Sequence, residues 1–353
     1  MSPSKPPAGE PPLPLALTLG EPSGIGPDIA IDAWLARKQA GVPAFILIGD
    51  AALMERRACA MGRTIPIRKT VPGEAAAVFE DALPCLDGAP LVAGRPGEAD
   101  RRDAAAVIAA VRQAVELVHE DLASAVVTNP IHKAALTRTG FEYPGHTEFL
   151  GALSQEVFGV AAQPVMMIAA PMLKVVPVTI HIPLAAVPQA LSREAIAATG
   201  RIVAHDLAKR FGIENPRLAV LGLNPHAGEN GTMGGEDEAV IAPAIADLVA
   251  EGIDASGPWP ADSMFHEAAR AGYDAALCMY HDQALIPVKA LAFDEAVNVT
   301  LGLPFIRTSP DHGTALPLAG TGKARTGSLI AALKLAAGLK AGPAASRSVG
   351  AAA

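Results

Sequence analysis

Three histidines stand at corresponding places in the sequence, each just beyond an apolar run of strand length. His181 follows the run 173–180, His281 follows 275–280, and His226 closes the Asn-Pro-His triplet after 217–223. Polar side chains beyond the carboxyl ends of strands in an open α/β sheet face the crevice where ligands bind. Neutral imidazole is a common ligand of divalent ions, and three protein ligands leave positions open for water or substrate. The pattern predicts a catalytic metal site, although three structural histidines explain the same positions equally well.

Five separated motifs give the chain a resemblance to a known family. They are GEPSGIGPD from Gly20, PGHTEFL from Pro144, NPHAGE from Asn224, YHDQ from Tyr280 and NVTLGLPFIRTSPDHGTA from Asn298. Together they resemble the 4-hydroxythreonine-4-phosphate dehydrogenases of pyridoxal phosphate biosynthesis, over about residues 15–337. The resemblance implies that His181, His226 and His281 hold one divalent cation per subunit, which is zinc, magnesium or cobalt. It also implies substrate contacts from His146, Thr147, Lys289, Asn298 and Arg307.

The reaction implied by this resemblance is oxidation of 4-phosphooxy-L-threonine by NAD or NADP. The product, 2-amino-3-oxo-4-phosphooxybutanoate, then loses carbon dioxide to give 3-amino-2-oxopropyl phosphate. A divalent cation would steady the negative charge that grows on one oxygen in both steps. Lys289 and Arg307 supply cations for the phosphate and carboxylate ends. Asp282, beside His281, is expected either to orient that ligand or to take the proton through water, so Asp282 and Lys289 are the catalytic candidates.

Two loops are candidates for binding the nicotinamide cofactor. The turn Gly20–Pro27 is glycine-rich and precedes a helix, which suits an anion near Gly24 and Gly26, but a tight structural turn fits as well. It is neither GxGxxG nor a Walker A loop. The run DHGTALPLAGTGKA from Asp311 resembles the loop of isopropylmalate and isocitrate dehydrogenases that grips the adenosine end of the cofactor. This second resemblance implies their fold, with two α/β/α domains and a central cleft, and makes four residues cofactor candidates: His312, Gly313, Thr314 and Ala315.

Three further places carry weaker expectations. Lys133 lies where the family has a lysine that pairs with a substrate oxygen, although a solvated lysine is the default. Asp262 is either a helix cap or a site residue near the substrate or metal. The acidic run 236–238 is expected to be solvated charge at the start of a helix.

Composition limits the classes of partner. The 353 residues are 50% hydrophobic and 18% charged, with a net charge of −8, which gives no basic face for nucleic acid and no polybasic membrane patch. No apolar run is long enough to span a membrane, and the first 14 residues lack the apolar core of a secretory signal. Cys59, Cys85 and Cys278 are far apart in apolar contexts, which predicts reduced core thiols in a cytoplasmic protein.

Apolar runs that alternate with helical patterns predict βαβ units and a parallel sheet. Strands are expected from Leu15, Ala44, Ile65 and Ser124, with helices from Asp28 and Ala51, over 101–122 and over 183–211. We expect disordered tails at 1–14 and 341–353. A cofactor domain is expected at 15–133 plus 308–340, and a metal, substrate and dimerisation domain at 134–307. The family resemblance implies a homodimer whose partner lends ligands to the site at the interface.

Two other functions remain open on sequence grounds. A related dehydrogenase for a phosphorylated threonate or erythronate, or for a dihydrodiol dicarboxylate, would share the three histidines. A phosphate-ligand binding protein on the same fold is the alternative from outside the enzymes, since fold alone does not give function.

Overall fold

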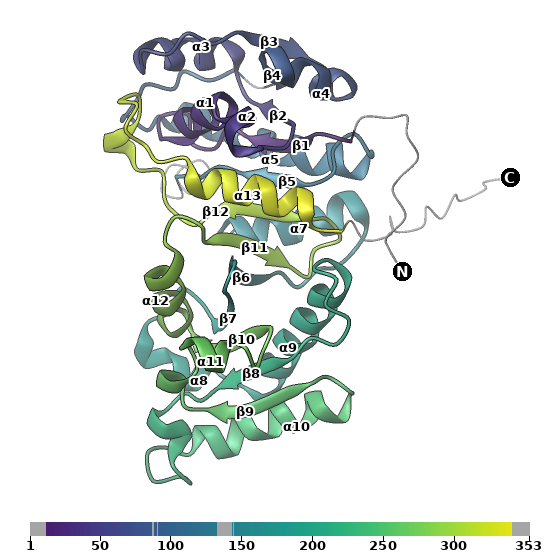
Figure 1. The fold of residues 1–353 in the computed structure, drawn as a ribbon, viewed down its shortest axis with the longest axis vertical. Coiled ribbons are helices and arrows are strands. Elements are labelled where there is room, and N and C mark those ends of the chain that lie inside the picture. The colour runs from purple at the N-terminus through teal and green to yellow at the C-terminus, as the bar shows by residue number, and fades with distance from the viewer. Residues whose placement is uncertain (1–11, 87, 90, 133–142, 144, 341–353) are drawn as a thin grey trace, which may run out of the picture. The chain divides into compact units, whose positions relative to one another are not determined.

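The computed structural model describes residues 12–86, 88–89, 91–132, 143 and 145–340. The chain divides into two compact units, one made of 1–142 with 312–326 and the other of 143–311 with 327–353. The expected tail at 341–353, and most of that at 1–14, lie outside the described residues. Each unit contributes its own strands and helices (Figure 1).

The first unit is built on a parallel sheet with the strand order β3-β4-β2-β1-β5. Strands β1 and β2 are fully buried, as expected of a parallel sheet whose two faces are covered by helices. Its strands are β1 Leu15–Thr18, β2 Phe45–Ile48, β3 Ile67–Thr70, β4 Leu83–Leu86 and β5 Val126–Thr128. Its helices are α1 Gly26–Leu35, α2 Arg37–Ala40, α3 Ala51–Ala60, α4 Pro72–Asp81, α5 Ala104–His119 and the short 3₁₀ turns η1 Arg101–Asp103 and η6 Leu316–Leu318.

The second unit has a mixed sheet with the strand order β12-β11-β6-β7-β10-β8-β9. Pairing is antiparallel from β12 to β7 and parallel from β7 to β9. Its strands are β6 Val165–Ala170, β7 Leu173–Thr179, β8 Leu218–Leu221, β9 Ala255–Trp259, β10 Ala275–Tyr280, β11 Val297–Leu301 and β12 Arg307–Pro310. Its helices are α7 His146–Phe158, α8 Val187–Ala190, α9 Arg193–Lys209, α10 Ala242–Ala250, α11 Glu267–Arg270, α12 His281–Ala292 and α13 Gly327–Gly338, with shorter turns η2 Leu184–Ala186, η3 Pro225–Gly228, η4 Asp237–Ile241 and η5 Ala261–Ser263.

Helix α12 covers the central strands of this sheet. It begins directly after β10 and packs on β7 and β10, while α9 packs on β6 and β7 (Figure 1). A buried cluster that includes Val175, Cys278, Leu285 and Val288 joins α12 to these strands. The carboxyl ends of β7, β10 and β8 are therefore backed by a packed core.

Several predicted elements differ in detail from the observed ones. The stretch 183–211 is not one helix, because Leu191 is extended and Ser192 begins a new helix, α9, by accepting a hydrogen bond from the Ala195 amide at 3.1 Å. The stretch 101–122 starts as the 3₁₀ turn η1 and is α-helical only over 104–119. Residues 308–311 and α13 group with the second unit, since β12 pairs with β11 and α13 packs on both.

Candidate active site

The three histidine-bearing strands are neighbours in the second unit. Strand β10 lies between β7 and β8 and pairs with both in parallel, with Tyr280 opposite Thr179 and Leu277 opposite Val220. The carboxyl ends of all three strands therefore lie on one edge of the sheet. His281 is the first residue of α12, His181 lies two residues beyond β7, and His226 lies in η3 beyond β8.

Two of the three imidazoles are close to each other. The ring centroids of His181 and His281 are 5.7 Å apart, with 43° between their planes. Nδ1 of His281 lies 2.7 Å from Oδ1 of Asp282, a contact that orients the ring and leaves Nε2 for another partner. His226 is 63% exposed, with its Nδ1 3.9 Å from Glu229. Within the described residues, no group of three or more His, Cys, Asp or Glu is gathered tightly enough to hold a metal ion.

The strand ends beneath these histidines are tied together by buried side chains. The Thr179 hydroxyl donates to the Met279 carbonyl at 2.7 Å and joins β7 to β10. The Gln283 side chain accepts from the Met279 amide at 2.6 Å and donates to the Gly222 carbonyl at 2.7 Å, which joins β10 to the end of β8. The sequence pattern placed Gln283 in a motif but gave no sign of this bridging contact.

Asp237 is buried, contrary to the expectation that the acidic run 236–238 is solvated. Its carboxylate accepts from the Leu223 amide at 2.8 Å, from the Asn224 amide at 3.3 Å and from the Asn224 side chain at 2.9 Å. The turn that leads to His226 thus folds around a carboxylate. Glu238 next to it is exposed, as the prediction had it.

Two of the residues expected to bind substrate, Arg307 and His146, lie close together in the second unit. Arg307 of β12 donates to the Thr300 hydroxyl at 2.9 Å, and its other terminal nitrogen lies 3.4 Å from Nδ1 of His146, at the start of α7. Burial lowers the pKa of the Arg307 guanidinium to about 10, which leaves it protonated at neutral pH. The site therefore has a desolvated cation beside an imidazole.

The other proposed contacts lie on nearby elements. Lys289 of α12 forms an ion pair with Asp311, at 3.1 Å between Nζ and Oδ2. Asn298 lies on β11, two residues from Thr300, and is partly exposed, as is Thr147 on α7. Lys133 lies outside the described residues.

The two predicted cofactor loops contact each other in the first unit. The Ile25 amide donates to the Thr314 carbonyl at 3.0 Å. A Cβ on Gly24 would lie 2.8 Å from that carbonyl, and one on Gly26 would lie 2.3 Å from the Leu19 carbonyl, so both glycines are needed for backbone packing. At Gly313 a Cβ would meet no described atom within 4 Å.

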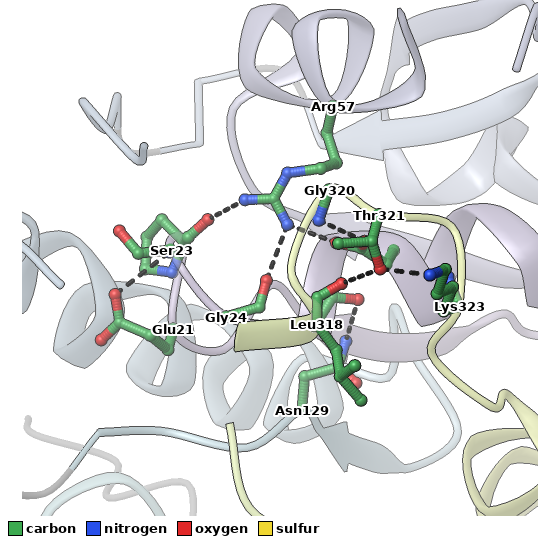
Figure 2. Close-up of polar contacts among 12 residues, drawn as sticks. Glu21, Ser23, Gly24, Arg57, Asn129, Leu318, Gly320, Thr321 and Lys323 are labelled. Atoms are coloured by element: carbon green, nitrogen blue, oxygen red, sulfur yellow. Dashed lines mark hydrogen bonds and ion pairs between the residues drawn. The ribbon is translucent and has the colours of Figure 1, made fainter. Parts of the chain in front are cut away.

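Arg57 of α3, which the sequence patterns did not single out, holds the first of these loops (Figure 2). Its guanidinium is buried, pairs with Asp28, and donates to the carbonyls of Gly24 and Pro22 at 2.7 Å each. Asp28 also accepts from the Gly320 amide at 2.6 Å, so one ion pair links α3, the glycine-rich turn and the loop 312–326. Burial raises the pKa of the Asp28 carboxyl, and the Arg57 charge opposes that rise.

Comparisons with known proteins establish the family of the chain. The family model of the pyridoxal phosphate biosynthetic protein PdxA matches residues 42–336. The chain belongs to the PdxA family. A 4-hydroxythreonine-4-phosphate dehydrogenase of Bradyrhizobium diazoefficiens is 57% identical over 331 residues, which cover 92% of this chain and 96% of the relative.

Solved structures of related enzymes cover nearly the whole chain. The crystal structure of the 4-hydroxythreonine-4-phosphate dehydrogenase from Klebsiella pneumoniae is 36% identical, has a TM-score of 0.82 and covers 92% of this chain and 98% of its own. A terephthalate 1,2-cis-dihydrodiol dehydrogenase from Burkholderia xenovorans is 27% identical, with a TM-score of 0.61 and coverage of 92% and 98%. Membership of a dehydrogenase family and the α/β fold class, both expected from the sequence, are thus confirmed.

The structure of this PdxA-family chain also bears on the expectations for Asp262 and for the cysteines. Asp262 is exposed on η5 and caps no helix there. Cys59 is exposed and not a core thiol, whereas Cys85 and Cys278 are buried. Burial raises the pKa of the Cys278 thiol well above its usual range, which makes it an unreactive packing residue.

Replacing Arg57 by Met tests whether the buried Arg57–Asp28 pair holds the glycine-rich turn in place. The variant leaves the Asp28 carboxylate and two loop carbonyls buried without their donor, and removing one partner of a buried ion pair costs about 3–5 kcal/mol. We expect the free energy of unfolding to fall by that amount in urea denaturation followed by circular dichroism. Arg63→Met is the matched control, because its ion pair with Asp32 is partly exposed and such a pair is worth about 0–1 kcal/mol. Equal stability of the two variants would contradict this role of Arg57.

Proposed function

We propose that this chain is an NAD- or NADP-dependent 4-hydroxythreonine-4-phosphate dehydrogenase of pyridoxine and pyridoxal phosphate biosynthesis. Membership of the PdxA family and the names of its relatives support this activity. The observation that carries the proposal is the shared edge of β7, β10 and β8, with three imidazoles on it. The overall reaction converts 4-phosphooxy-L-threonine to 2-amino-3-oxo-4-phosphooxybutanoate, which decarboxylates to 3-amino-2-oxopropyl phosphate.

The electron flow has two parts. In the oxidation, the nicotinamide cofactor would supply the hydride acceptor for the secondary alcohol carbon, and the hydroxyl proton would leave to a base. In the decarboxylation, the bond to the carboxylate breaks, carbon dioxide leaves, the electron pair moves towards the new keto oxygen, and the amino-bearing carbon then takes up a proton. Both parts build negative charge at the same oxygen, so one preorganised positive centre serves both.

The metal ligands that we propose are His181, His226 and His281, with one zinc, magnesium or cobalt ion per subunit. Among these ions the donor set suits zinc best, because imidazole is a ligand that zinc prefers and magnesium prefers oxygen, and two of the rings are already adjacent. When bound, the ion would act as a Lewis acid towards the reacting oxygen. Asp282 fits the role of orienting His281 through its 2.7 Å contact, and it is the nearest candidate to receive the proton through water.

The substrate contacts that we propose are those of the family motifs: His146, Thr147, Lys289, Asn298 and Arg307. Arg307 is protonated and desolvated, and a cation in such surroundings gains more from an arriving phosphate or carboxylate than a solvated one. Lys289, held by Asp311, places an ammonium group on α12, the helix that starts with His281. Gripping both ends of the substrate would orient its reacting carbon.

The cofactor contacts that we propose are in the first unit, at Gly24, Gly26, His312, Gly313, Thr314 and Ala315. The hydrogen bond between the two loops supports their acting together.

We further propose a cytoplasmic homodimer whose partner subunit completes the site at the interface. The open position of His226 supports completion by other groups. Two large apolar side chains are exposed on or directly after α12, Ile286 at 66% and Phe293 at 61%, as a helix covered by a partner would have. Three free cysteines fit a reducing compartment.

Within the described residues, no helix has the length and apolar character needed to cross a membrane.

The metal role of His226 has a direct test. We expect His226→Ala to lose bound zinc and turnover together, since one of three ligands is gone, while its circular dichroism spectrum is unchanged. His205→Ala, an exposed histidine of α9, is the control and should keep both. Metal content by mass spectrometry and nicotinamide absorbance report the two properties. Full turnover by metal-free protein would rule out the role.

Arg307→Lys tests recognition of the substrate's anionic end. Lysine keeps the positive charge but not the forked array of donors. We expect the KM for 4-phosphooxy-L-threonine to rise about tenfold or more, which corresponds to about 1.4 kcal/mol. The control Arg193→Lys alters an exposed ion pair and should leave KM unchanged. An unchanged KM in Arg307→Lys would remove this residue from the substrate contacts.

A substrate panel separates the proposed activity from its nearest alternative. The match to a dihydrodiol dehydrogenase structure makes a related alcohol the second candidate. We expect kcat/KM to be highest for 4-phosphooxy-L-threonine among that compound, phosphorylated threonate, phosphorylated erythronate and a dihydrodiol dicarboxylate, in the presence of zinc and either NAD or NADP. A higher value for any of the others would reassign the substrate.

A further inference from the structure

We propose that Gln283 and Asp237 are positioning residues that grip the corner 222–224 from two sides and so set the place of His226 relative to His281. The inference rests on the proposed metal role of these histidines. It adds two residues that touch neither the ion nor the substrate. The corner lies directly after β8, where the chain leaves the sheet on its way to His226.

Gln283 fixes the corner from the side of β10. The side chain is 9% exposed and uses both ends of its amide, accepting from the Met279 amide and donating to the Gly222 carbonyl. Met279 is two residues before His281, and Gly222 is four residues before His226. One rigid amide therefore spans the two strand ends that deliver these histidines.

Asp237 fixes the corner from the other side. A Cβ on Gly222 would lie 2.6 Å from Oδ1 of Asp237, so the backbone is pressed against the carboxylate. The next two residues, Leu223 and Asn224, then donate their amides and one side-chain nitrogen to it. A carboxylate accepts hydrogen bonds at both of its oxygens, which asparagine of the same shape cannot do, because its amide nitrogen is a donor.

The segment after the corner needs such support. Positive φ angles occur at every residue from His226 to Gly231, including four that are not glycine: His226, Ala227, Glu229 and Asn230. Each such residue costs of order 1–3 kcal/mol and persists only when its surroundings hold it. His226 is mostly exposed, so its position follows from the backbone that carries it. Losing the contacts of either Gln283 or Asp237 with the corner is therefore expected to move His226 and weaken metal binding.

The test compares zinc binding in four variants of the full chain. Gln283→Met keeps the side-chain length and removes both hydrogen bonds, and Asp237→Asn keeps the shape and one acceptor oxygen. Glu238→Gln makes the same charge change on the exposed neighbour of Asp237. Thr199→Val removes a partly buried hydrogen bond to the Ala195 carbonyl inside α9, a helix that carries none of the three proposed metal ligands. Zinc affinity is measured by isothermal titration in the absence of substrate and cofactor.

We expect Gln283→Met and Asp237→Asn to bind zinc about 10–100-fold more weakly than the unaltered chain, the range usual for groups that orient metal ligands. Glu238→Gln and Thr199→Val should bind it equally well. Turnover of the two weakened variants should be rescued by excess zinc, with KM for the substrate unchanged. A residue with a purely structural role would not give rescue by the ion.

Two results separate the failure of this inference from the failure of the proposed function. Unaltered zinc affinity in folded Asp237→Asn and Gln283→Met would overturn the positioning role while leaving the metal site intact. If Gln283→Met does not fold, Asp237→Asn decides the matter, because it disturbs the buried turn least. Equal zinc binding by the unaltered chain and His226→Ala would instead overturn the metal role in the proposed function.

Discussion

The parallel pairing of β7, β10 and β8 is the constraint on which the rest of the second unit depends. Backbone hydrogen bonds set these strands side by side in one direction, so residues that are far apart in sequence leave the sheet at one edge. His181, His226 and His281 share that edge because of this pairing alone. The hydrogen bonds of Thr179 and Gln283 then fix how far apart the ends lie.

The buried guanidinium groups of the two units have different partners. In the first, the buried Arg57–Asp28 pair is used internally and holds the glycine-rich turn against the loop 312–326. In the second, Arg307 is equally buried but contacts a hydroxyl and an imidazole, and its pKa is lowered by desolvation. The first arrangement stabilises a loop, whereas the second is where we propose that an anionic group of the substrate binds.

Much of this architecture follows from local sequence patterns, and the remainder depends on contacts between remote residues. Apolar runs predicted the strands that carry the histidines, and the order of the motifs predicted the family and fold. The break at Ser192 was missed because apolar periodicity continues across it, although a serine before a helical pattern is a signal for a cap. The burial of Asp237 could not be read from an acidic run, because its partners lie 13 or 14 residues earlier. Likewise Gln283 meets Gly222 across 61 residues, a pairing that only the sheet order reveals.

The central claim is that three imidazoles from this edge hold one cation. Anomalous diffraction at the zinc absorption edge, from crystals of the full chain grown with zinc, tests it most directly. We predict one strong peak per subunit, about 2.0–2.1 Å from a ring nitrogen of each of His181, His226 and His281. A zinc peak bound elsewhere, with these three rings pointing apart in every subunit of the crystal, would contradict it.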